Sequence, residues 1–427
     1  MSDLPTSASA PPRAVIAQTI ARILERVNAI SADGPGFTRP SYSALESQAH
    51  AVVEAEAVAL GCLVRRDAAG NLFATMPGQN RAARPLYIGS HLDTVSQGGA
   101  YDGQAGVIGA LAVLTAFHSA GLTPPMDLVL TITRAEESVW FPVSYAGSRA
   151  ALGRLNPEDF DAPRSDTGLS LAEHMALEGF DPEAVRSITP PEPARFLEFH
   201  IEQGPVLHDA GEAYAVVDRV RGGLRYRSAE VHGIWAHSGG APRASRADAV
   251  VALAELILSM DAVWDRFLDE GNDLTVTFGK VDAASPQHAM AKVPGHAEFC
   301  LDLRSDQTDT LEAANAALLR EVARIEKARP GVRFDLGAQT RPAPAQLSGE
   351  MARFVTAGAA AQGDDPRHML SGGGHDAAAF GAAGWDSVMV FIRNWNGSHC
   401  PEEGMDEADL ARAVGAVFLA ILQEAAG

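Results

Sequence analysis

Short apolar runs alternate with helix-like patterns through the first half of the chain, and this alternation restricts its fold more than any other feature. Residues 86–89, 126–133 and 196–201 are apolar or β-branched, as buried strands are. Between the first two runs, residues 106–120 repeat apolar side chains at helical spacing. Strand, helix and strand in this order, separated by glycine-rich loops, predict an α/β domain with a largely parallel sheet covered by helices.

The pattern changes after about residue 217, where a different arrangement of elements begins. The new order of strand-like and helical segments is β-α-β-β-α-β, which is typical of a ferredoxin-like α+β unit. The segments are residues 224–232, 247–267, 274–281, 296–304, 310–328 and 332–336. We therefore predict that residues 1–217 and 337–427 form one domain, interrupted by an inserted domain at residues 218–336.

The composition excludes several classes of function. The chain has 427 residues, is 46% hydrophobic and carries a formal charge of −20, so it can form a sizeable core but would repel nucleic acid and anionic membranes. Its three cysteines are far apart, which argues against a disulfide framework and a thiolate zinc site. Residues 1–13 are polar without an apolar run, so we expect a cytoplasmic protein without a secretory signal.

Polar side chains of the kind that bind metals follow four of the predicted strands. Glu136 and Glu137 follow one strand, and three further strands lead to His91, to His200 and to His399. In open α/β sheets, binding sites form outside the carboxyl ends of the strands, so these side chains are expected to share one pocket.

A pocket crowded with carboxylates needs a compensating cation, because neighbouring acidic groups would otherwise protonate. Imidazole and carboxylate ligands suit Zn²⁺, and also Mn²⁺, Co²⁺ or Ni²⁺. Asp102, at the start of the helix after His91, could bridge two ions. Asp93 lies two residues after His91, on the same face of an extended backbone, and could hold the second imidazole nitrogen of His91.

The motifs that carry these residues resemble one family over nearly the whole chain. They are Gly89-Ser90-His91-Leu92-Asp93-Thr94-Val95, Tyr101-Asp102-Gly103, Glu136-Glu137, His200-Ile201-Glu202-Gln203-Gly204-Pro205, Ser371-Gly372-Gly373-Gly374-His375-Asp376-Ala377 and Gly397-Ser398-His399. In this order they resemble the amidase/hydantoinase/carbamoylase branch of the dinuclear zinc aminoacylase–carboxypeptidase superfamily. N-carbamoyl-L-amino acid hydrolase, allantoate amidohydrolase and β-ureidopropionase belong to that branch.

The resemblance implies two divalent metal ions, most simply Zn²⁺, bridged by Asp102. His91 and His200 would complete one site, and Glu137 and His399 the other. Glu136 would be the general base for a metal-bound water, whose pKa the metal lowers to about 7. The implied reaction is hydrolysis of a non-peptide C–N bond in an N-carbamoyl or N-acyl amino acid.

The resemblance also implies residues that bind the substrate, which is a small molecule expected to carry a carboxylate. His237, in the inserted domain, would stabilise the oxyanion in the site of the partner subunit of a homodimer, so that this domain acts in dimerisation and as a lid. Arg304 would bind the substrate carboxylate. The remaining implied contacts are Gln203, Gly373, Gly374 and His375.

Three departures from the family pattern affect the predicted pocket. Trp140 stands where the family has a Gly-Ser-Arg-Phe segment, Ala291-Lys292 replaces an Asn before Val293, and Arg243 follows Gly240-Ala241-Pro242 where Met is usual. We expect hydrolysis to be kept and substrate preference to be shifted, with Trp140 favouring a bulky or aromatic group. A di- or aminopeptidase and a non-catalytic metal-stabilised binding protein are the alternatives, and the intact Glu136 argues against the second.

Overall fold

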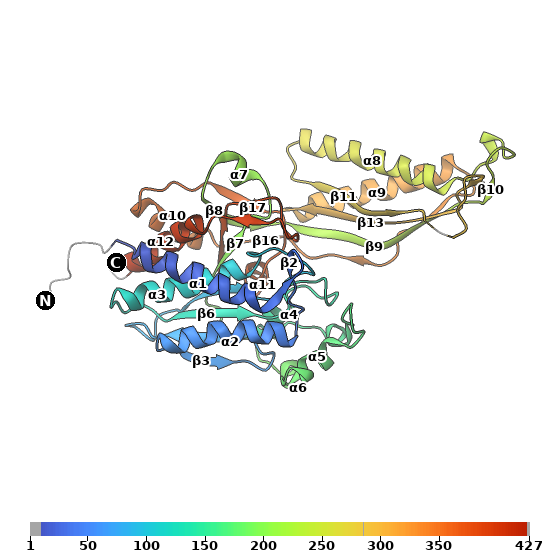
Figure 1. Ribbon diagram of the computed structural model, residues 1–427. Helices are drawn as coiled ribbons and strands as arrows, with labels where there is room; N and C mark the ends of the chain where they lie inside the picture. Colours follow the sequence, from blue (N-terminus) through green and yellow to red (C-terminus); the bar gives the residue numbers. More distant parts are fainter. Residues whose placement is uncertain (1–9, 285, 425–427) are drawn as a thin grey trace. The chain divides into compact units, whose positions relative to one another are not determined.

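A computed structural model describes residues 10–284 and 286–424, and the chain divides into two compact units (Figure 1). The main unit combines Met1–Asp218 with Gln346–Gly427, and the inserted unit is Arg219–Ala345. Most of the polar N-terminal segment, where we expected no secretory signal, lies outside the described residues. Within the described part of the chain, no helix has both the length and the apolar character needed to cross a membrane.

The main unit contains a nine-stranded sheet whose four central strands are parallel. In spatial order these strands are β18 (Asp386–Ile392), β7 (Arg195–Ile201), β5 (Leu86–His91) and β6 (Leu128–Thr133). Antiparallel strands flank them on both sides. The outer strands are β3 (Leu63–Arg66), β4 (Leu72–Met76), β8 (Tyr214–Val220), β16 (Ala345–Gln346) and β17 (His368–Ser371). The sheet that we predicted as largely parallel is thus mixed, and the parallel part is its centre.

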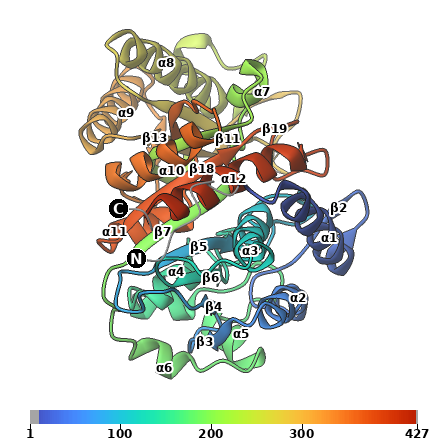
Figure 2. The same cartoon turned by 90° about the vertical axis from the view of Figure 1, so that its left-hand side faces the viewer.

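Helices cover both faces of this sheet, which explains why its central strands are apolar on both sides. Four helices lie together on one face, where they pack on alternate strand residues such as Leu86 and Ile88 (Figure 2). They are α1 (Arg13–Ser31), α3 (Gln104–Ser119), α10 (Gly349–Ala361) and α12 (Glu407–Glu424). On the other face, α11 (Asp376–Ala382) packs on β7 and β18, and the rings of Phe196 and Phe380 stack with centroids 4.0 Å apart.

The remaining elements of the main unit are short, apart from one long helix beside the sheet. The helix α2 (Ala44–Ala59) packs against α1 and β4. The short elements are β1 (Ala32–Asp33), β2 (Gly36–Phe37), α4 (Ala146–Ala151), a 3-10 helix (Pro157–Asp161), α5 (Leu171–Leu177), α6 (Pro182–Arg186), α7 (Val206–Ala210), β19 (Asn394–Trp395) and β20 (Gly404–Met405). The strands β3 and β4 form an antiparallel hairpin, and the chain between them includes Ala69-Gly70-Asn71.

The inserted unit has the predicted ferredoxin-like order. Its antiparallel sheet has the spatial order β11-β13-β9-β14, and its helices pack against one face only. The elements are β9 (Gly222–His232), β10 (Ala236–His237), a 3-10 helix (Arg243–Ser245), α8 (Ala249–Asp269), β11 (Thr275–Asp282), β12 (Lys292–Val293), β13 (His296–Ser305), α9 (Thr308–Ala328), β14 (Arg333–Asp335) and β15 (Gln339–Thr340). The unit extends past residue 336, the predicted boundary, because β15 also pairs with β9.

Candidate functional site

Six predicted residues gather at the carboxyl ends of the four parallel strands of the main unit. They are His91, Asp102, Glu136, Glu137, His200 and His399. His91 ends β5 and His200 lies near the end of β7, whereas the others lie in the loops that follow β5, β6 and β18. Among the six, only the side chain of His399 is about half exposed, so the cluster is accessible to solvent from its side.

Asp102 stands between two groups of ligand-type atoms, one on each of its oxygens. Its Oδ1 lies 3.1 Å from Nε2 of His200 and 3.8 Å from Nε2 of His91. Its Oδ2 lies 3.2 Å from Nε2 of His399, and that nitrogen lies 3.4 Å from Oε1 of Glu137. The two groups, His91–Asp102–His200 and Asp102–Glu137–His399, thus share one carboxylate.

These separations fit the geometry of a divalent metal. Ligand atoms that are about 2.0–2.2 Å from a tetrahedral zinc ion lie about 3.3–3.6 Å from one another. The measured separations between imidazole nitrogens and carboxylate oxygens are 3.1 to 3.8 Å. The donor set of three imidazoles and two carboxylates is also one that Zn²⁺, Mn²⁺, Co²⁺ and Ni²⁺ accept.

The two buried histidines have their tautomer fixed by hydrogen bonds on the far side of the ring. Nδ1 of His91 lies 3.0 Å from the carbonyl oxygen of Asp93, and Nδ1 of His200 lies 2.9 Å from that of Ile201. A carbonyl only accepts, so each Nδ1 carries the proton. In the neutral ring, each Nε2 then has the lone pair with which a histidine binds a metal.

The cluster has the electrostatics of a cation site. Burial raises the pKa of Glu136 well above its usual value and also raises that of Glu137. Hydrogen bonds to Asp102 and Glu137 raise the pKa of His399 to about 11. The raised pKa values mean that the two glutamates lose their protons less readily and that His399 keeps its proton more readily. Both effects show that this pocket favours added positive charge.

Glu136 and Glu137 differ in their side-chain partners although they are neighbours. Glu137 faces His399, whereas the Glu136 carboxylate has no hydrogen-bond or ion-pair partner within residues 10–284 and 286–424. Both backbone amides donate to Asp93, at 3.2 Å each. The backbone is therefore held in place while the Glu136 side chain stays available to handle a proton.

Asp93 is fully buried and links the ends of β5 and β6 to the N-terminal part of the chain. Its Oδ1 lies 3.3 Å from Nδ1 of His91, and its Oδ2 accepts a hydrogen bond of 2.6 Å from Ser41. Burial alone would raise the pKa of Asp93, but the contact with His91 lowers it. The predicted role of holding His91 fits this geometry, and the carboxylate in addition positions the Glu136–Glu137 backbone.

Backbone conformations that are rare for residues with side chains occur at the site. Gln203 and His399 have φ values of 61° and 60°. Such conformations are unfavourable for residues other than glycine and are concentrated at functional sites. Gly103 has a φ of 67°, and a Cβ there would lie 2.3 Å from the ring of His91, so glycine is required on both counts.

Two residues that sequence reasoning missed support Asp102. Glu403 is buried, and its Oε1 accepts from the backbone amides of Tyr101 and Asp102 at 2.9 and 3.2 Å. The Ser398 hydroxyl lies 2.9 Å from Glu403 Oε2 and 2.8 Å from Asp102 Oδ2. Burial raises the pKa of Glu403 to about 7. Ser398 was visible beside His399 in the sequence, but nothing in the sequence marked Glu403.

The predicted substrate-binding loop lies against the cluster. Gln203 donates a 2.8 Å hydrogen bond to Asp102, and a Cβ on Gly373 would lie 3.2 Å from the Gln203 side-chain oxygen. The ring of His375 lies 4.3 Å from that of His200, centroid to centroid, and its Nε2 is 2.9 Å from the Ser371 hydroxyl.

The loop that contains Gly373 and His375 is also closely packed against other parts of the main unit. Gly374 lies so close to Tyr145 that a Cβ would overlap the phenol oxygen. Asp376 is buried and accepts hydrogen bonds from Thr133 and Ser148. Glu198, on β7, accepts from the backbone amide of Ala377 at 2.8 Å, and burial raises its pKa to about 7. These contacts fix the loop at the carboxyl end of β6 and β7.

Trp140, which we predict to contact the substrate, is buried beside the site. Its side chain is buried with a relative exposure of 7%, within an apolar cluster that includes Phe141 and Tyr42. Its indole N–H donates a 2.7 Å hydrogen bond to the carbonyl oxygen of Thr94, the residue after Asp93. The indole thus packs next to the site, and its contact with the substrate stays a prediction.

The inserted unit holds His237 in one tautomer. Nδ1 of His237 accepts hydrogen bonds from the backbone amides of Gly239 and Gly240, at 3.2 and 3.0 Å. The proton of a neutral ring must then be on Nε2, where it is available to a substrate oxygen. Ala291, one of the departures from the family pattern, accepts a 2.8 Å hydrogen bond from the Ser238 amide. Arg243 is exposed in a 3-10 turn.

Arg304 lies on the face of the inserted sheet that the helices leave open. It pairs with Asp302 at 2.8 Å, and its side chain is 32% exposed. Asp302 also lies 3.3 Å from Arg225 on the adjacent strand. These charges place one carboxylate between two guanidinium groups, and the Arg304 side chain is partly exposed.

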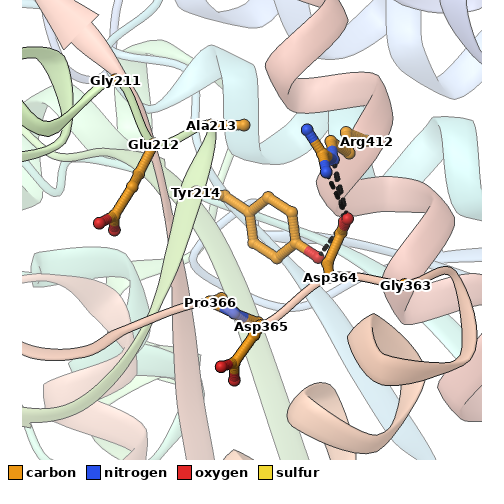
Figure 3. A pocket seen from close by; sticks show the side chains of 9 residues that line it. All are labelled: Gly211, Glu212, Ala213, Tyr214, Gly363, Asp364, Asp365, Pro366 and Arg412. Carbon is orange, nitrogen blue, oxygen red and sulfur yellow. Dashed lines mark hydrogen bonds and ion pairs between the residues drawn. The ribbon is translucent and has the colours of Figure 1, made fainter.

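A surface pocket of the main unit lies away from the predicted residues (Figure 3). It has a volume of about 250 Å³ and is lined by parts of residues 211–214 and 363–366 and by Arg412. Its central polar groups satisfy one another: Asp364 pairs with Arg412 and accepts a 2.8 Å hydrogen bond from Tyr214 (Figure 3). None of the predicted site residues lines this pocket.

Comparisons with known proteins find relatives that are similar over nearly the whole chain. N-carbamoyl-L-amino-acid amidohydrolase of Paenarthrobacter aurescens is 31% identical over 410 residues, which covers 94% of this chain and 96% of the relative. Allantoate amidohydrolase of Bacillus subtilis is 30% identical over 374 residues, covering 87% and 89%. An amidase of the hydantoinase/carbamoylase family from Burkholderia multivorans is 26% identical, with a TM-score of 0.85 over 96% of this chain and 98% of that one.

The fold, the cluster and these relatives define a hydrolase of C–N bonds. Residues 87–423 match the peptidase family M20/M25/M40. The chain belongs to this family, and within it to the hydantoinase/carbamoylase branch that its motifs resemble.

Proposed function

We propose that the protein hydrolyses a non-peptide C–N bond of an N-carbamoyl, ureido or N-acyl amino acid. The observation that carries this proposal is the Asp102 carboxylate shared between two sets of ligand atoms, with Glu136 beside them. The names of the relatives in Paenarthrobacter aurescens and Bacillus subtilis support the choice of substrate class.

Two divalent ions would be held by the five ligands. His91 and His200 would bind one ion, Glu137 and His399 the other, and Asp102 both. Bound ions of this kind supply Lewis acidity and lower the pKa of a water molecule to about 7. The residue pattern suits Zn²⁺, and Mn²⁺, Co²⁺ and Ni²⁺ accept the same ligands.

Glu136 would take the proton of the attacking water and pass it to the departing nitrogen. Its carboxylate is close to fully buried and lacks a fixed partner within the described parts of the chain, as a group that must accept and release a proton requires. The burial that raises its pKa also makes its carboxylate a stronger base than that of an exposed glutamate, which favours general base catalysis. Asp93 would hold the backbone of Glu136 and the ring of His91 in fixed positions.

His237 would stabilise the oxyanion that develops on the carbonyl. The two amides that hold its Nδ1 leave an Nε2–H donor, which is the group that an oxyanion requires. We propose that it does so in the partner's site of a homodimer, with the inserted unit acting as lid and dimerisation domain. Arg304 would bind a substrate carboxylate, with Gln203 and the Gly373–His375 loop as further contacts.

The substrate class is tested by incubating the protein, loaded with each of the four metals, with N-carbamoyl, ureido, formyl and acyl amino acids and unblocked dipeptides. Ammonia and free amine are measured separately, because a carbamoyl group releases ammonia and an acyl group does not. Turnover of ureido compounds without dipeptide cleavage is expected. Cleavage of dipeptides alone would support a peptidase instead, and metal binding without any turnover would support a binding protein.

The role of His237 is tested by mixing two inactive variants, Glu136→Gln and His237→Ala. In a hybrid dimer, one site would combine an intact Glu136 with a His237 supplied by the other chain. Mixing and subunit exchange should therefore restore activity that neither variant has alone. If His237 acted within its own chain, no combination would restore it.

A further inference from the structure

The open face of the inserted sheet carries two histidines directly opposite each other. His232 on β9 and His296 on β13 are paired residues of the antiparallel ladder, and their ring centroids are 5.4 Å apart. Their strand neighbours Val231 and Ala297 are buried under the helices, so the histidines lie on the face that the helices leave uncovered. Cross-strand neighbours on one face have their side chains within contact distance.

Glu230, two residues before His232 on the same face, brings a carboxylate to both imidazoles. Its Oε2 lies 3.1 Å from Nε2 of His232 and 3.4 Å from Nε2 of His296. The ligand-type atoms of these three residues all lie within 4.8 Å of one another. Two imidazole nitrogens and one oxygen at such separations match the spacing of about 3.3–3.6 Å around a tetrahedral zinc ion.

A second observation on the same face is a row of carboxylates, which lies beside the row in which Arg333 pairs with His232. Four carboxylates form one row across the four strands, because Asp335 pairs with Glu230, Glu230 with Glu298, and Glu298 with Asp282. Like charges directly opposite each other destabilise a sheet. Lys280 lies 2.8 Å from Glu298 and offsets one of them. A divalent cation at Glu230 would offset more of this repulsion.

We propose that His232, His296 and Glu230 bind a divalent transition-metal ion, with Zn²⁺ as the best match and water completing the coordination. Three protein ligands of this type leave one position open in a tetrahedral site. The proposal rests on the inserted unit alone and does not depend on the function proposed for the main unit.

The ion would fasten two strands where the segment that carries His237 begins. Gly233–Trp235 joins His232 to β10, and Pro294-Gly295 joins β12 to His296. β10 and β12 pair with each other through Ala236–Val293 and His237–Lys292. A metal between His232 and His296 would therefore close the base of this two-stranded arm. We expect it to stabilise the arm rather than to take part in hydrolysis.

The test counts Zn²⁺ ions on the full-length protein by equilibrium dialysis at a buffered micromolar free Zn²⁺ concentration. The parent should retain one ion more per chain than the double variant His232→Ala/His296→Ala. His368→Ala is the matched control, since His368 is an exposed histidine beside one carboxylate, 3.4 Å from Asp218, and should keep the parent's count. Equal counts in the parent and the double variant would overturn the proposal.

Two further measurements keep the result interpretable. In EDTA, the double variant should unfold at the temperature of the parent, which shows that a lost ion does not reflect a damaged fold. The comparison is repeated in an Asp102→Ala background, which removes the shared ligand of the main unit. In this background, the difference of one ion between the protein with both histidines and the double variant should persist, even if the function proposed for the main unit fails. If the difference disappeared, the ion would belong to the main unit and the proposal would be overturned.

Discussion

Replacing Asp93 by Asn tests how the buried carboxylate holds the site together. One Asp93 oxygen faces Nδ1 of His91 and the Glu136 amide, and the other faces the Glu137 amide and the Ser41 hydroxyl. All four partners are donors in this arrangement. An asparagine keeps one oxygen and turns the other into an NH₂ group, which would then face two donors.

The structure sets the expected magnitude of this change. Two hydrogen bonds to a charged acceptor are lost in either orientation of the amide, and each contributes about 1.5–3 kcal/mol. Asp93→Asn should therefore lower the unfolding free energy of the metal-free protein by about 3–6 kcal/mol. Loss of the partner that orients His91 should also weaken metal binding by about 10–100-fold.

Urea unfolding followed by tryptophan fluorescence measures the first effect, and Zn²⁺ titration against a chelating dye measures the second. Ser41→Ala is the matched control, because it removes only one of the four hydrogen bonds to the charged acceptor and should cost about 1.5–3 kcal/mol. An Asp93→Asn protein within about 1 kcal/mol of the parent, with unchanged Zn²⁺ affinity, would refute the reasoning, since each lost bond is expected to count.

Three further predictions follow from burial and charge. Trp140→Phe should lower the unfolding free energy by about 1 kcal/mol through the lost hydrogen bond to Thr94. If Trp140 selects the substrate, the ratio of kcat/KM for aromatic and aliphatic substrates should also change, and an unchanged ratio would contradict that role. His50 is fully buried with both ring nitrogens unpartnered within the described residues, and burial lowers its pKa well below 6.5. The unfolded chain therefore binds a proton below about pH 6.5 that the folded protein does not, so the unfolding free energy decreases as the pH falls. His50→Phe should remove about 1.4 kcal/mol of this decrease per pH unit. Parallel profiles of unfolding free energy against pH for the two proteins would contradict the assignment. Chelation of the metal should lower the unfolding temperature, and Zn²⁺ at about 100 times its Kd should restore about 2.7 kcal/mol of stability per site. An unfolding temperature that does not respond to chelation would contradict the binding of metal by the folded protein.

The clustering of the candidate ligands could be predicted from the sequence because strand direction and strand ends are local properties. An apolar run followed by His91 or Glu137 predicts where a strand ends. Because the strands are parallel, these ends lie at one edge of the sheet. The inserted unit was predictable for the same reason, since its helical and strand periods differ clearly.

The residues that were missed depend on long-range packing. Glu403 reaches the Asp102 amide across about 300 residues, and no local pattern marks it. The burial of Trp140 likewise follows from the packing of an apolar cluster, which no local sequence pattern predicts. The pairing of His232 with His296 depends on strand register, which the hydrophobic pattern alone does not set to one residue.

The Glu136→Gln variant tests the central claim most directly, because glutamine has the shape of glutamate but cannot accept the proton. Metal content and the kcat of the parent and the variant are measured on the same ureido substrate at the same pH. The account predicts an unchanged metal content with a fall in kcat of about 10²–10⁴-fold. A variant with the metal content and the kcat of the parent would contradict the assignment of Glu136 as the general base.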